Sequence, residues 1–291
     1  MEWDDVLEQF DLHLRFERHL AENTLLAYRR DLRDLRDHSR GRSPSVMTAE
    51  DLRDWLQDVS RAGRSPRTQA RKLVAARRLF RFLKARGHRS DDPASFVDLP
   101  KVGRPLPRVV SHAWVLRILD LARSSARDTA WVGLMYGSGL RVSEVCNLTL
   151  DRLYLQEGFL RVLGKGSKER VAPMAPGVGS MLRVYLEVER PRALRGQLND
   201  AVFPGRSGRG CISRQAVFLR IRRLSQEAGV PDSVSPHVLR HAFATELVRG
   251  GADLRSIQTM LGHADLRTTE VYTHLGTEHL RRAYDRAHPR A

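Results

Sequence analysis

Six side chains between positions 141 and 272 have the types needed to cut a phosphodiester bond. They are Arg141, Lys165, His237, Arg240, His263 and Tyr272. Phosphoryl transfer builds negative charge on the non-bridging oxygens, and arginine suits that charge because its planar guanidinium binds two oxygens and stays protonated. Lysine or histidine can protonate the leaving oxygen. Tyrosine can attack phosphorus where cations stabilise its phenolate.

Each of these residues also has an ordinary explanation. An arginine after a glycine turn is commonly a surface charge, a Gly-Lys-Gly turn is common in hairpins, and a histidine at a helix start is commonly a polar cap. The full set in this order favours a phosphate site with a nucleophile. The residue types do not distinguish the role of His237 from that of His263.

Metal chemistry is the alternative interpretation of the histidines. His237 and His241 lie four residues apart, a spacing that can bind zinc, but Arg240 would place a positive charge beside the ion. We therefore expect no metal, and we expect His241 to support the helix or the phosphate site indirectly. The sequence has no nucleotide-binding glycine loop and no clustered carboxylates, so we also expect no cofactor.

The candidate residues require a mixed set of elements to position them. Ser235 and Pro236 predict the start of a helix that carries His237 and Arg240 and ends at residues 250–251. Glycines 137 and 139 end a helix over 126–136 and lead to a short helix at Arg141. Strands over 153–155, 159–163 and 169–174 predict an antiparallel meander, with Lys165 in its second turn. Further helices are expected over 111–122, 176–189, 212–228, 253–261, 265–273 and 276–287, the first with Val115, Ile118 and Leu121 inward.

The first third of the chain predicts an all-helical domain. Helices are expected over 3–20, 23–37, 48–61 and 65–87; Asn23 caps the second, and Thr48 and Asp51 form a capping box at the third. Residues 90–108 contain four prolines and little periodicity, which is typical of a linker. We therefore expect a DNA-binding domain over 1–100, a linker over 101–108 and a catalytic domain over 109–291.

The charge of the chain favours a polyanionic partner. Lys+Arg number 50 against 34 Asp+Glu, a formal net charge of +16. Residues 61–89 contain eleven Lys/Arg and no acid. Arg64, Arg67, Arg71 and Arg78 lie opposite the apolar face of the fourth helix, and the lack of acids to pair with them predicts contacts with a DNA backbone. The alternative is an ordinary solvated face.

Two further features concern the compartment. The chain has only two cysteines, outside any metal-ligand spacing, which predicts a reducing compartment, the cytoplasm. Its first residues are acidic, and the sequence contains neither a signal-peptide core nor a run long enough to cross a bilayer.

The ordered motifs resemble those of a known family. They are 136–144 (YGSGLRVSE), 164–170 (GKGSKER), 236–245 (PHVLRHAFAT), 261–263 (LGH) and 269–274 (TEVYTH). Together they are similar to the tyrosine recombinases, specifically the bacterial Xer type, and residues 23–32 are similar to that family's second helix. The tail, 284–291, is more similar to the XerC branch than to the XerD branch. Ala242 and Glu246 depart from the residues common there, at positions outside the six.

The resemblance implies a role for each of the six residues. Tyr272 is implied to form a 3′-phosphotyrosyl link, Arg141 and Arg240 to clamp the scissile phosphate, and His263 to bind a non-bridging oxygen. Lys165 is implied to protonate the 5′-oxygen, with His237 assisting. Separately, Glu144 either orients a catalytic side chain or forms a local ion pair with Arg141.

The resemblance also implies a fold, partners and a biological role. The fold is mainly α, with four N-terminal helices and an α+β catalytic domain that contains a small antiparallel sheet. Members act on double-stranded DNA as tetramers, so residues 276–287 either dock on a neighbouring protomer or pack within their own domain. The implied role is resolution of chromosome dimers with a related partner recombinase. The alternatives are a phage or mobile-element integrase, a type IB topoisomerase, or a catalytically silent DNA-binding relative.

Overall fold

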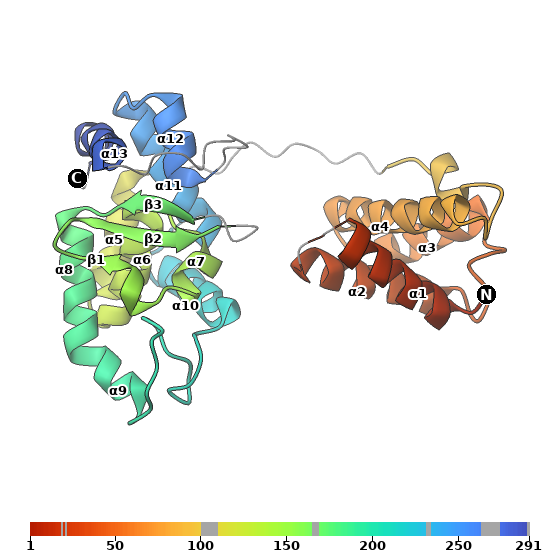
Figure 1. The fold of residues 1–291 in the computed structure, drawn as a ribbon, viewed down its shortest axis with the longest axis horizontal. Coiled ribbons are helices and arrows are strands. Elements are labelled where there is room, and N and C mark those ends of the chain that lie inside the picture. The colour runs from red at the N-terminus through yellow and green to blue at the C-terminus, as the bar shows by residue number, and fades with distance from the viewer. Residues whose placement is uncertain are drawn as a thin grey trace. The chain divides into compact units, whose positions relative to one another are not determined.

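The computed structural model describes residues 1–18, 20, 22–99, 110–164, 169–230, 234–262 and 274–289, with only the backbone of 23 and 274–279. The chain divides into two compact units, Met1–Pro105 and Leu106–Ala291. Each unit buries its own hydrophobic core. The fold is mainly helical with one small antiparallel sheet, as predicted (Figure 1). No helix among the described residues is both long and apolar enough to cross a membrane.

The first unit contains the four predicted helices. They are α1 (Trp3–Leu12), continued by a π-helical turn at His13–Glu17, α2 (Glu22–His38), α3 (Ala49–Arg61) and α4 (Pro66–Ala85). The capping box of α3 is confirmed, since the Thr48 side chain accepts from the Asp51 N–H and the Asp51 carboxylate accepts from the Thr48 N–H. At α4 only the first of these bonds is present, since the Ser65 side chain accepts from the Thr68 N–H. Helix α2 begins at Glu22, so position 23, predicted as its cap, lies inside the helix.

The proline-containing segment after α4 is only partly a linker. A 3-10 helix at Pro93–Phe96 places Pro93, Ala94 and Val97 among the buried residues of the first unit. Arg77 of α4 holds this turn by donating to the carbonyl oxygens of Ala94 (3.2 Å) and Val97 (2.6 Å). Residues 93–97 therefore belong to the first unit, and residues 100–109 lie outside the described part.

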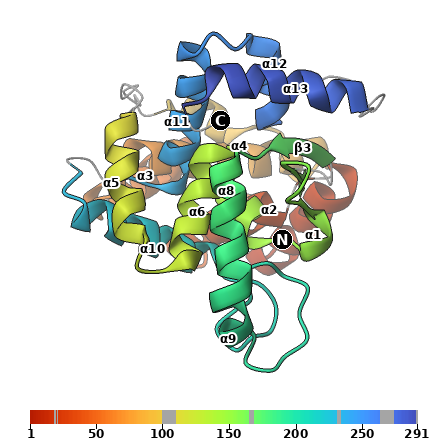
Figure 2. The same ribbon diagram turned by 90° about the vertical axis from the view of Figure 1, so that its left-hand side faces the viewer.

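In the second unit the other elements pack around the central helix α6. Its elements are α5 (His112–Ala122), α6 (Ala126–Gly137), α7 (Val142–Cys146), β1 (Leu153–Tyr154), β2 (Phe159–Leu163), β3 (Glu169–Pro173), α8 (Pro176–Val184), α9 (Arg190–Leu194), α10 (Arg214–Glu227), α11 (Pro236–Arg249), α12 (Leu254–Leu261) and α13 (His274–Ala287). The strands form the predicted meander in the order β1-β2-β3. Figure 2 shows α6 between α5 and α8. Trp131 and Tyr136 of α6 are fully buried.

One prediction for this unit is wrong about which side chain is buried. Leu121 was expected inward but is 41% exposed, while Leu119 is buried. The buried stripe of α5 follows the helical period at Val115, Ile118 and Leu119, and Leu121 falls off that stripe. The predicted helix over 265–273 lies outside the described residues.

Helix α13 packs on its own unit. Leu280, Ala283 and Tyr284 are buried in the core of the second unit. The Tyr284 hydroxyl donates to the carbonyl oxygen of Gly137 at 2.7 Å, which ties α13 to the end of α6. Of the two interpretations of residues 276–287, the structure therefore shows packing within the domain.

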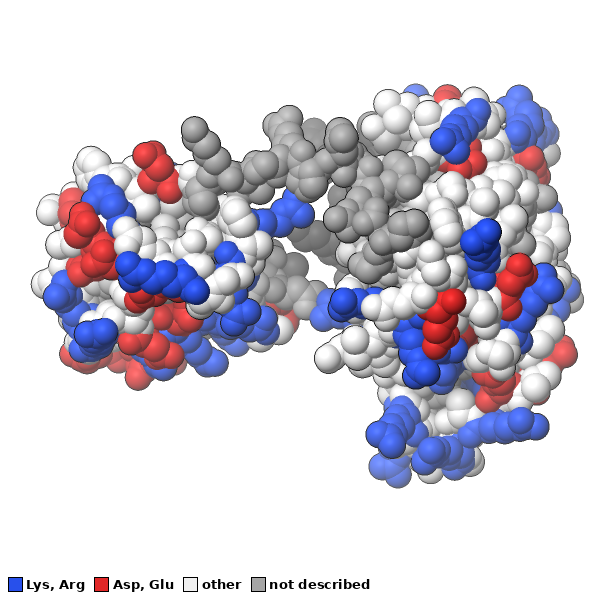
Figure 3. All heavy atoms as spheres, turned by 180° about the vertical axis from the view of Figure 1, so that it is seen from behind, with Lys and Arg blue, Asp and Glu red and all other residues white. Residues whose placement is uncertain are grey.

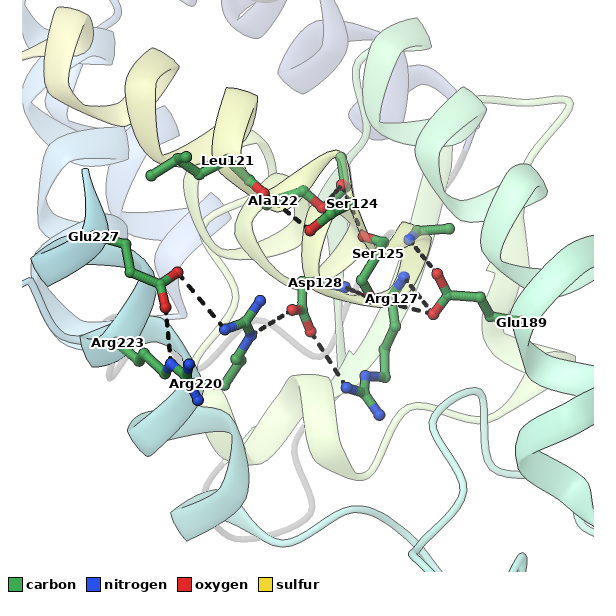
Figure 4. Close-up of polar contacts among 12 residues, drawn as sticks. Leu121, Ala122, Ser124, Ser125, Arg127, Asp128, Glu189, Arg220, Arg223 and Glu227 are labelled. Carbon is green, nitrogen blue, oxygen red and sulfur yellow. Dashed lines mark hydrogen bonds and ion pairs between the residues drawn. The ribbon is translucent and has the colours of Figure 1, made fainter.

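A buried polar network fixes the other end of α6 (Figure 4). The Glu189 carboxylate accepts from the N–H groups of Ala126 and Arg127 in the first turn, where a negative charge also complements the helix dipole. The Asp128 carboxylate, 1% exposed, accepts from Nε of Arg220 on α10 at 2.5 Å. These contacts set the position of α6, and thereby of the turn that follows it.

Candidate active site

Arg141 is placed by the turn that ends α6. Gly139 in this turn has a φ of +64°, and a Cβ there would lie 2.5 Å from the ring of Phe243. Glycine is therefore required both for the backbone conformation and for the approach of α11. The Leu140 N–H donates back to the Leu134 carbonyl at 3.2 Å, and Arg141 then begins α7.

Glu144 of α7 is the centre of the site. Its side chain is 3% exposed, and its two carboxylate oxygens accept from Arg141, once from the backbone N–H (2.7 Å) and once from Nη1 (2.9 Å). Arg170 of β3 binds the same carboxylate with a two-pronged contact at 2.7 and 2.8 Å. Nη1 of Arg240 lies 3.6 Å from Oε2. Glu144 is therefore more than the local partner of Arg141, since it also joins β3 and α11 to α7.

Arg240 reaches this carboxylate from the buried face of α11. Its guanidinium donates to the carbonyl oxygen of Gly139 and, at 2.5 Å, to that of Leu261 at the end of α12. The side chain is 8% exposed, whereas the side chain of Arg141 is 31% exposed. Arg141 and Arg240 therefore both approach one carboxylate, and Arg141 is the more exposed of the two.

Arg170 was not identified as a functional residue from the sequence. It is 5% exposed, and its Nε donates to the carbonyl oxygen of Met260 at 2.8 Å. A signal was present, since Arg170 precedes the buried apolar run Val171–Pro173 of the same strand, and a charge in such a strand needs a buried partner. The sequence could not say which acid supplies that partner.

The cluster carries more positive than negative charge. Three guanidinium groups surround one carboxylate, which leaves a net charge of about +2 in a largely buried space. Burial raises the pKa of Glu144, but the hydrogen bonds and charge of Arg170, with further cationic and backbone partners, lower it overall. Burial and the charge of Arg141 lower the pKa of Arg240 to about 9. An anion bound by both Arg141 and Arg240 would offset the repulsion between their charges, and a phosphate has the charge and geometry to bind both guanidiniums.

The structure brings together two of the six predicted residues and leaves a third nearby. Arg141 and Arg240 share Glu144, as described above. His237 lies one turn before Arg240 on α11, but its side chain is exposed. Lys165, His263 and Tyr272 lie outside the described residues. His241, expected to support the site or the helix, has an exposed side chain.

The end of α12 adjoins the arginine cluster. Gly262 ends that helix with a φ of +65°, and a Cβ there would lie 3.0 Å from Cδ of Arg170. His263 follows Gly262 directly in the sequence. The cluster therefore fixes the backbone from which the chain continues towards the expected nucleophile.

The expected DNA-contact arginines of α4 differ in their surroundings. Arg71 forms an ion pair with the buried Asp31 of α2, so the prediction that no acid pairs with these arginines is wrong. The acid comes from a neighbouring helix rather than from the same segment. Arg78 lies over the ring of Tyr28 at 5.5 Å. Arg64 and Arg67 are exposed and form no ion pair within the described ranges.

On the face shown in Figure 3, basic and acidic side chains are mixed. Figure 3 shows lysine and arginine side chains interspersed with aspartate and glutamate on the visible face of each unit. Several arginines are neutralised by neighbours, as Arg29 is by Asp11 at 2.5 Å and Arg36 by Asp4 at 2.8 Å. The net charge of +16 is therefore an excess spread over both units rather than a local patch on that face.

Comparison with known proteins matches both units. The Phage integrase family model matches residues 108–279, and the model of the phage integrase N-terminal SAM-like domain matches residues 7–87. The chain is 44% identical to the tyrosine recombinase XerD of Caulobacter vibrioides, over 99% of this chain and 96% of the relative. It is 40% identical to XerD of Vibrio cholerae, over 98% and 97%.

Solved structures support the same fold. The XerA recombinase is 28% identical, with a TM-score of 0.52 over 99% of this chain and 100% of the other. A lambda integrase tetramer bound to a Holliday junction is 17% identical, with a TM-score of 0.72 over 94% and 80% of the chains.

These relatives correct one expectation from the sequence. The tail was expected to mark the XerC branch, whereas the relatives found along the full chain are named XerD. Eight terminal residues contain less information than an alignment over nearly the whole chain. With a family model that spans residues 108–279 and relatives at 40–44% identity, this chain belongs to the phage integrase family of tyrosine recombinases.

Proposed function

We propose that this protein is a Xer-type site-specific recombinase that cuts and rejoins DNA through a 3′-phosphotyrosyl intermediate at Tyr272. The observation that carries the proposal is the pair Arg141 and Arg240 around the buried Glu144, which leaves excess positive charge next to the partly exposed side chain of Arg141. Two fixed guanidiniums of this kind suit the non-bridging oxygens of a phosphate.

The reaction follows from the chemistry of the six residues. The Tyr272 hydroxyl gives up its proton, with His237 as the proposed acceptor, and its oxygen attacks phosphorus. A Tyr–O–P bond forms, and the bond from phosphorus to the 5′-oxygen breaks. Lys165 supplies the proton of the leaving oxygen, while His263 and His237 assist at the phosphate. A 5′-hydroxyl of another strand reverses the step, so the phosphotyrosyl bond itself supplies the energy for rejoining and no nucleotide is consumed.

The domain roles are part of the proposal. The DNA-binding domain would be residues 1–100 and the catalytic domain residues 109–291, with residues 101–108 as the linker between them. Arg71 already neutralises Asp31, and Arg78 lies against Tyr28. The contacts of α4 with the DNA backbone are therefore assigned mainly to Arg64 and Arg67. The match of a SAM-like domain model over residues 7–87 supports a separate role for the first unit.

The partners and the biological role rest on the relatives. The XerD names of full-length relatives support resolution of chromosome dimers, together with a related partner recombinase. The lambda integrase tetramer on a Holliday junction supports a tetramer on two double-stranded DNA sites. Since chromosomal DNA is the substrate, the protein would act in the cytoplasm.

A nicked suicide substrate tests the chemistry. A DNA site is first selected from a randomised duplex library by binding to the Tyr272→Phe variant, and a nick beside the cleavage point then traps the covalent intermediate. We expect a covalent protein–DNA band with wild type and with the control Tyr154→Phe, and none with Tyr272→Phe at equal DNA binding. Absence of the band with wild type would favour a silent DNA-binding relative.

Recombination assays test the finer role. With two copies of the selected site on one plasmid, we expect resolution only when the partner recombinase of the same genome is added. Resolution by this protein alone would instead favour a phage or mobile-element integrase. Relaxation of plasmids that lack the site would favour a topoisomerase.

A further inference from the structure

We infer that Arg170 is a positioning residue of the active site, which neutralises Glu144 so that Arg141 and Arg240 remain available for the phosphate. This inference rests on the proposed function. It also assigns to Arg170 a second contact, with the end of α12, from which the chain continues to His263 and Tyr272.

The geometry of Arg170 fits positioning rather than contact with DNA. Its side chain is 5% exposed, and both terminal nitrogens bind the two oxygens of Glu144, at 2.7 and 2.8 Å. Its Nε donates to the carbonyl oxygen of Met260 at 2.8 Å. A guanidinium held at three nitrogens inside the unit would have to break these bonds to reach a phosphate.

The contact between Arg170 and Glu144 matters because Glu144 and the phosphate compete for the same two guanidiniums, those of Arg141 and Arg240. Nη1 of Arg240 is already 3.6 Å from Oε2 of Glu144, and Nη1 of Arg141 donates to Oε1 at 2.9 Å. Without Arg170, these two arginines would be the remaining cations next to a buried carboxylate. The net charge of the cluster would fall from about +2 to about +1, and the arginines would turn towards Glu144 instead of the phosphate.

The same residue holds the last turn of α12. Arg170 binds the carbonyl oxygen of Met260, and Arg240 binds that of Leu261, the next residue. Gly262 then lies against the aliphatic part of Arg170. Cationic donors on these last carbonyls satisfy the end of the helix and complement its dipole. Arg170 and Arg240 therefore join the carboxylate of Glu144 to the last turn of α12.

The test separates cleavage from binding. Arg170→Gln removes the charge, Arg170→Lys keeps it but cannot form the two-pronged contact, and Arg161→Gln on the exposed face of β2 is the matched control. We expect Arg170→Gln to lower the single-turnover cleavage rate on the suicide substrate about 100-fold. Its DNA dissociation constant should change by less than about 3-fold, since Arg170 does not reach the surface. Arg170→Lys should lose about 10-fold in rate, and Arg161→Gln should cleave as wild type.

A double variant distinguishes neutralisation from a merely structural role. Arg170→Gln combined with Glu144→Gln restores the net charge of the cluster to about +2, so its cleavage should be faster than that of Arg170→Gln alone. If Arg170 acts only through stability, the second substitution should lower the rate further. Thermal unfolding of every variant is measured alongside. Where Arg170→Gln alone does not fold, the double variant is compared with Glu144→Gln alone; similar cleavage rates of these two support neutralisation, and a much slower double variant would overturn it.

The outcomes separate this inference from the proposed function. Wild-type rates for Arg170→Gln, or a double variant no faster than Arg170→Gln, would overturn the inference while covalent cleavage by wild type still supports the function. Failure of wild type to form the covalent complex would overturn both. The expected pattern of slow cleavage, retained binding and rescue by the double variant supports both.

Discussion

Replacing Gly139 with alanine should destabilise the second unit for two reasons, the backbone conformation at this position and a steric conflict with Phe243. A second glycine allows the two contributions to be measured separately. The φ of +64° costs a residue with a Cβ about 1–2 kcal/mol. The added methyl would also lie 2.5 Å from the ring of Phe243, which is fully buried, and such overpacking costs about 1–3 kcal/mol. We therefore expect a total loss of about 2–5 kcal/mol in the free energy of unfolding of the second unit.

Gly229→Ala is the matched control for this prediction. Gly229 lies in the same unit with a φ of +66°, but a Cβ there meets nothing within 4 Å. It should lose only the conformational part, about 1–2 kcal/mol. The difference between the two variants therefore reports the conflict with Phe243.

Urea unfolding followed by hydrogen exchange of peptides from α6 and α11 provides the measurement. Cleavage should fall in Gly139→Ala as well, because the carbonyl of residue 139 accepts from Arg240. The added substitution Phe243→Leu should recover part of the stability of Gly139→Ala, since it removes the ring atoms that the methyl meets. Equal destabilisation of the two glycine variants would refute the reasoning.

Three further predictions follow from the charges. The pKa of Glu144 is lowered below its usual 4.5 in the folded protein. Ionised Glu144 therefore stabilises the fold above pH 4.5, and this stabilisation is lost as the pH falls through the pKa that Glu144 has in the folded protein. Unfolding measured over an acid titration should show this loss in wild type and a smaller loss in Glu144→Gln. Asp128→Asn should lower the free energy of unfolding by about 2–3 kcal/mol in a urea titration, because Arg220 loses its buried partner. The control Asp120→Asn, at an exposed ion pair, should change that free energy by less than about 0.5 kcal/mol. Arg67→Gln should reduce the slope of log affinity against log salt by about one in a DNA-binding titration. Arg71→Gln should leave that slope nearly unchanged and destabilise the first unit, since the buried Asp31 loses its closer partner and keeps Lys72 at 3.8 Å. Equal slopes for Arg67→Gln and wild type would remove Arg67 from the DNA interface.

Local signals predicted most of the elements correctly. The capping box of Thr48 and Asp51, the Ser65–Pro66 start of α4 and the glycine turn after α6 all depend on hydrogen bonds between residues at most six positions apart. The hairpins of the meander are similarly local. An error occurred at Leu121, where packing decided which face is buried. The turn at 93–97 lies within the predicted first domain, but its proline-containing sequence did not predict that it packs into the core.

Pairings between distant residues were not predictable from the sequence. The segment 61–89 contains no acid, yet Asp31 reaches Arg71 from 40 positions away. The sequence suggested that Glu144 pairs with Arg141, three residues apart, and this is confirmed. It offered no means to see that Arg170, 26 positions further on, binds the same carboxylate.

The sequence by itself determined the residue types, their order and the helices and turns that carry them, because those elements are stabilised by neighbours along the chain. Only the tertiary structure decided that Arg240 reaches Gly139 across 101 positions, and that one buried carboxylate joins Arg141, Arg170 and Arg240. The physical reason is that burial makes an unpaired charge costly, so each arginine is fixed by whichever acid or carbonyl the packing brings within reach.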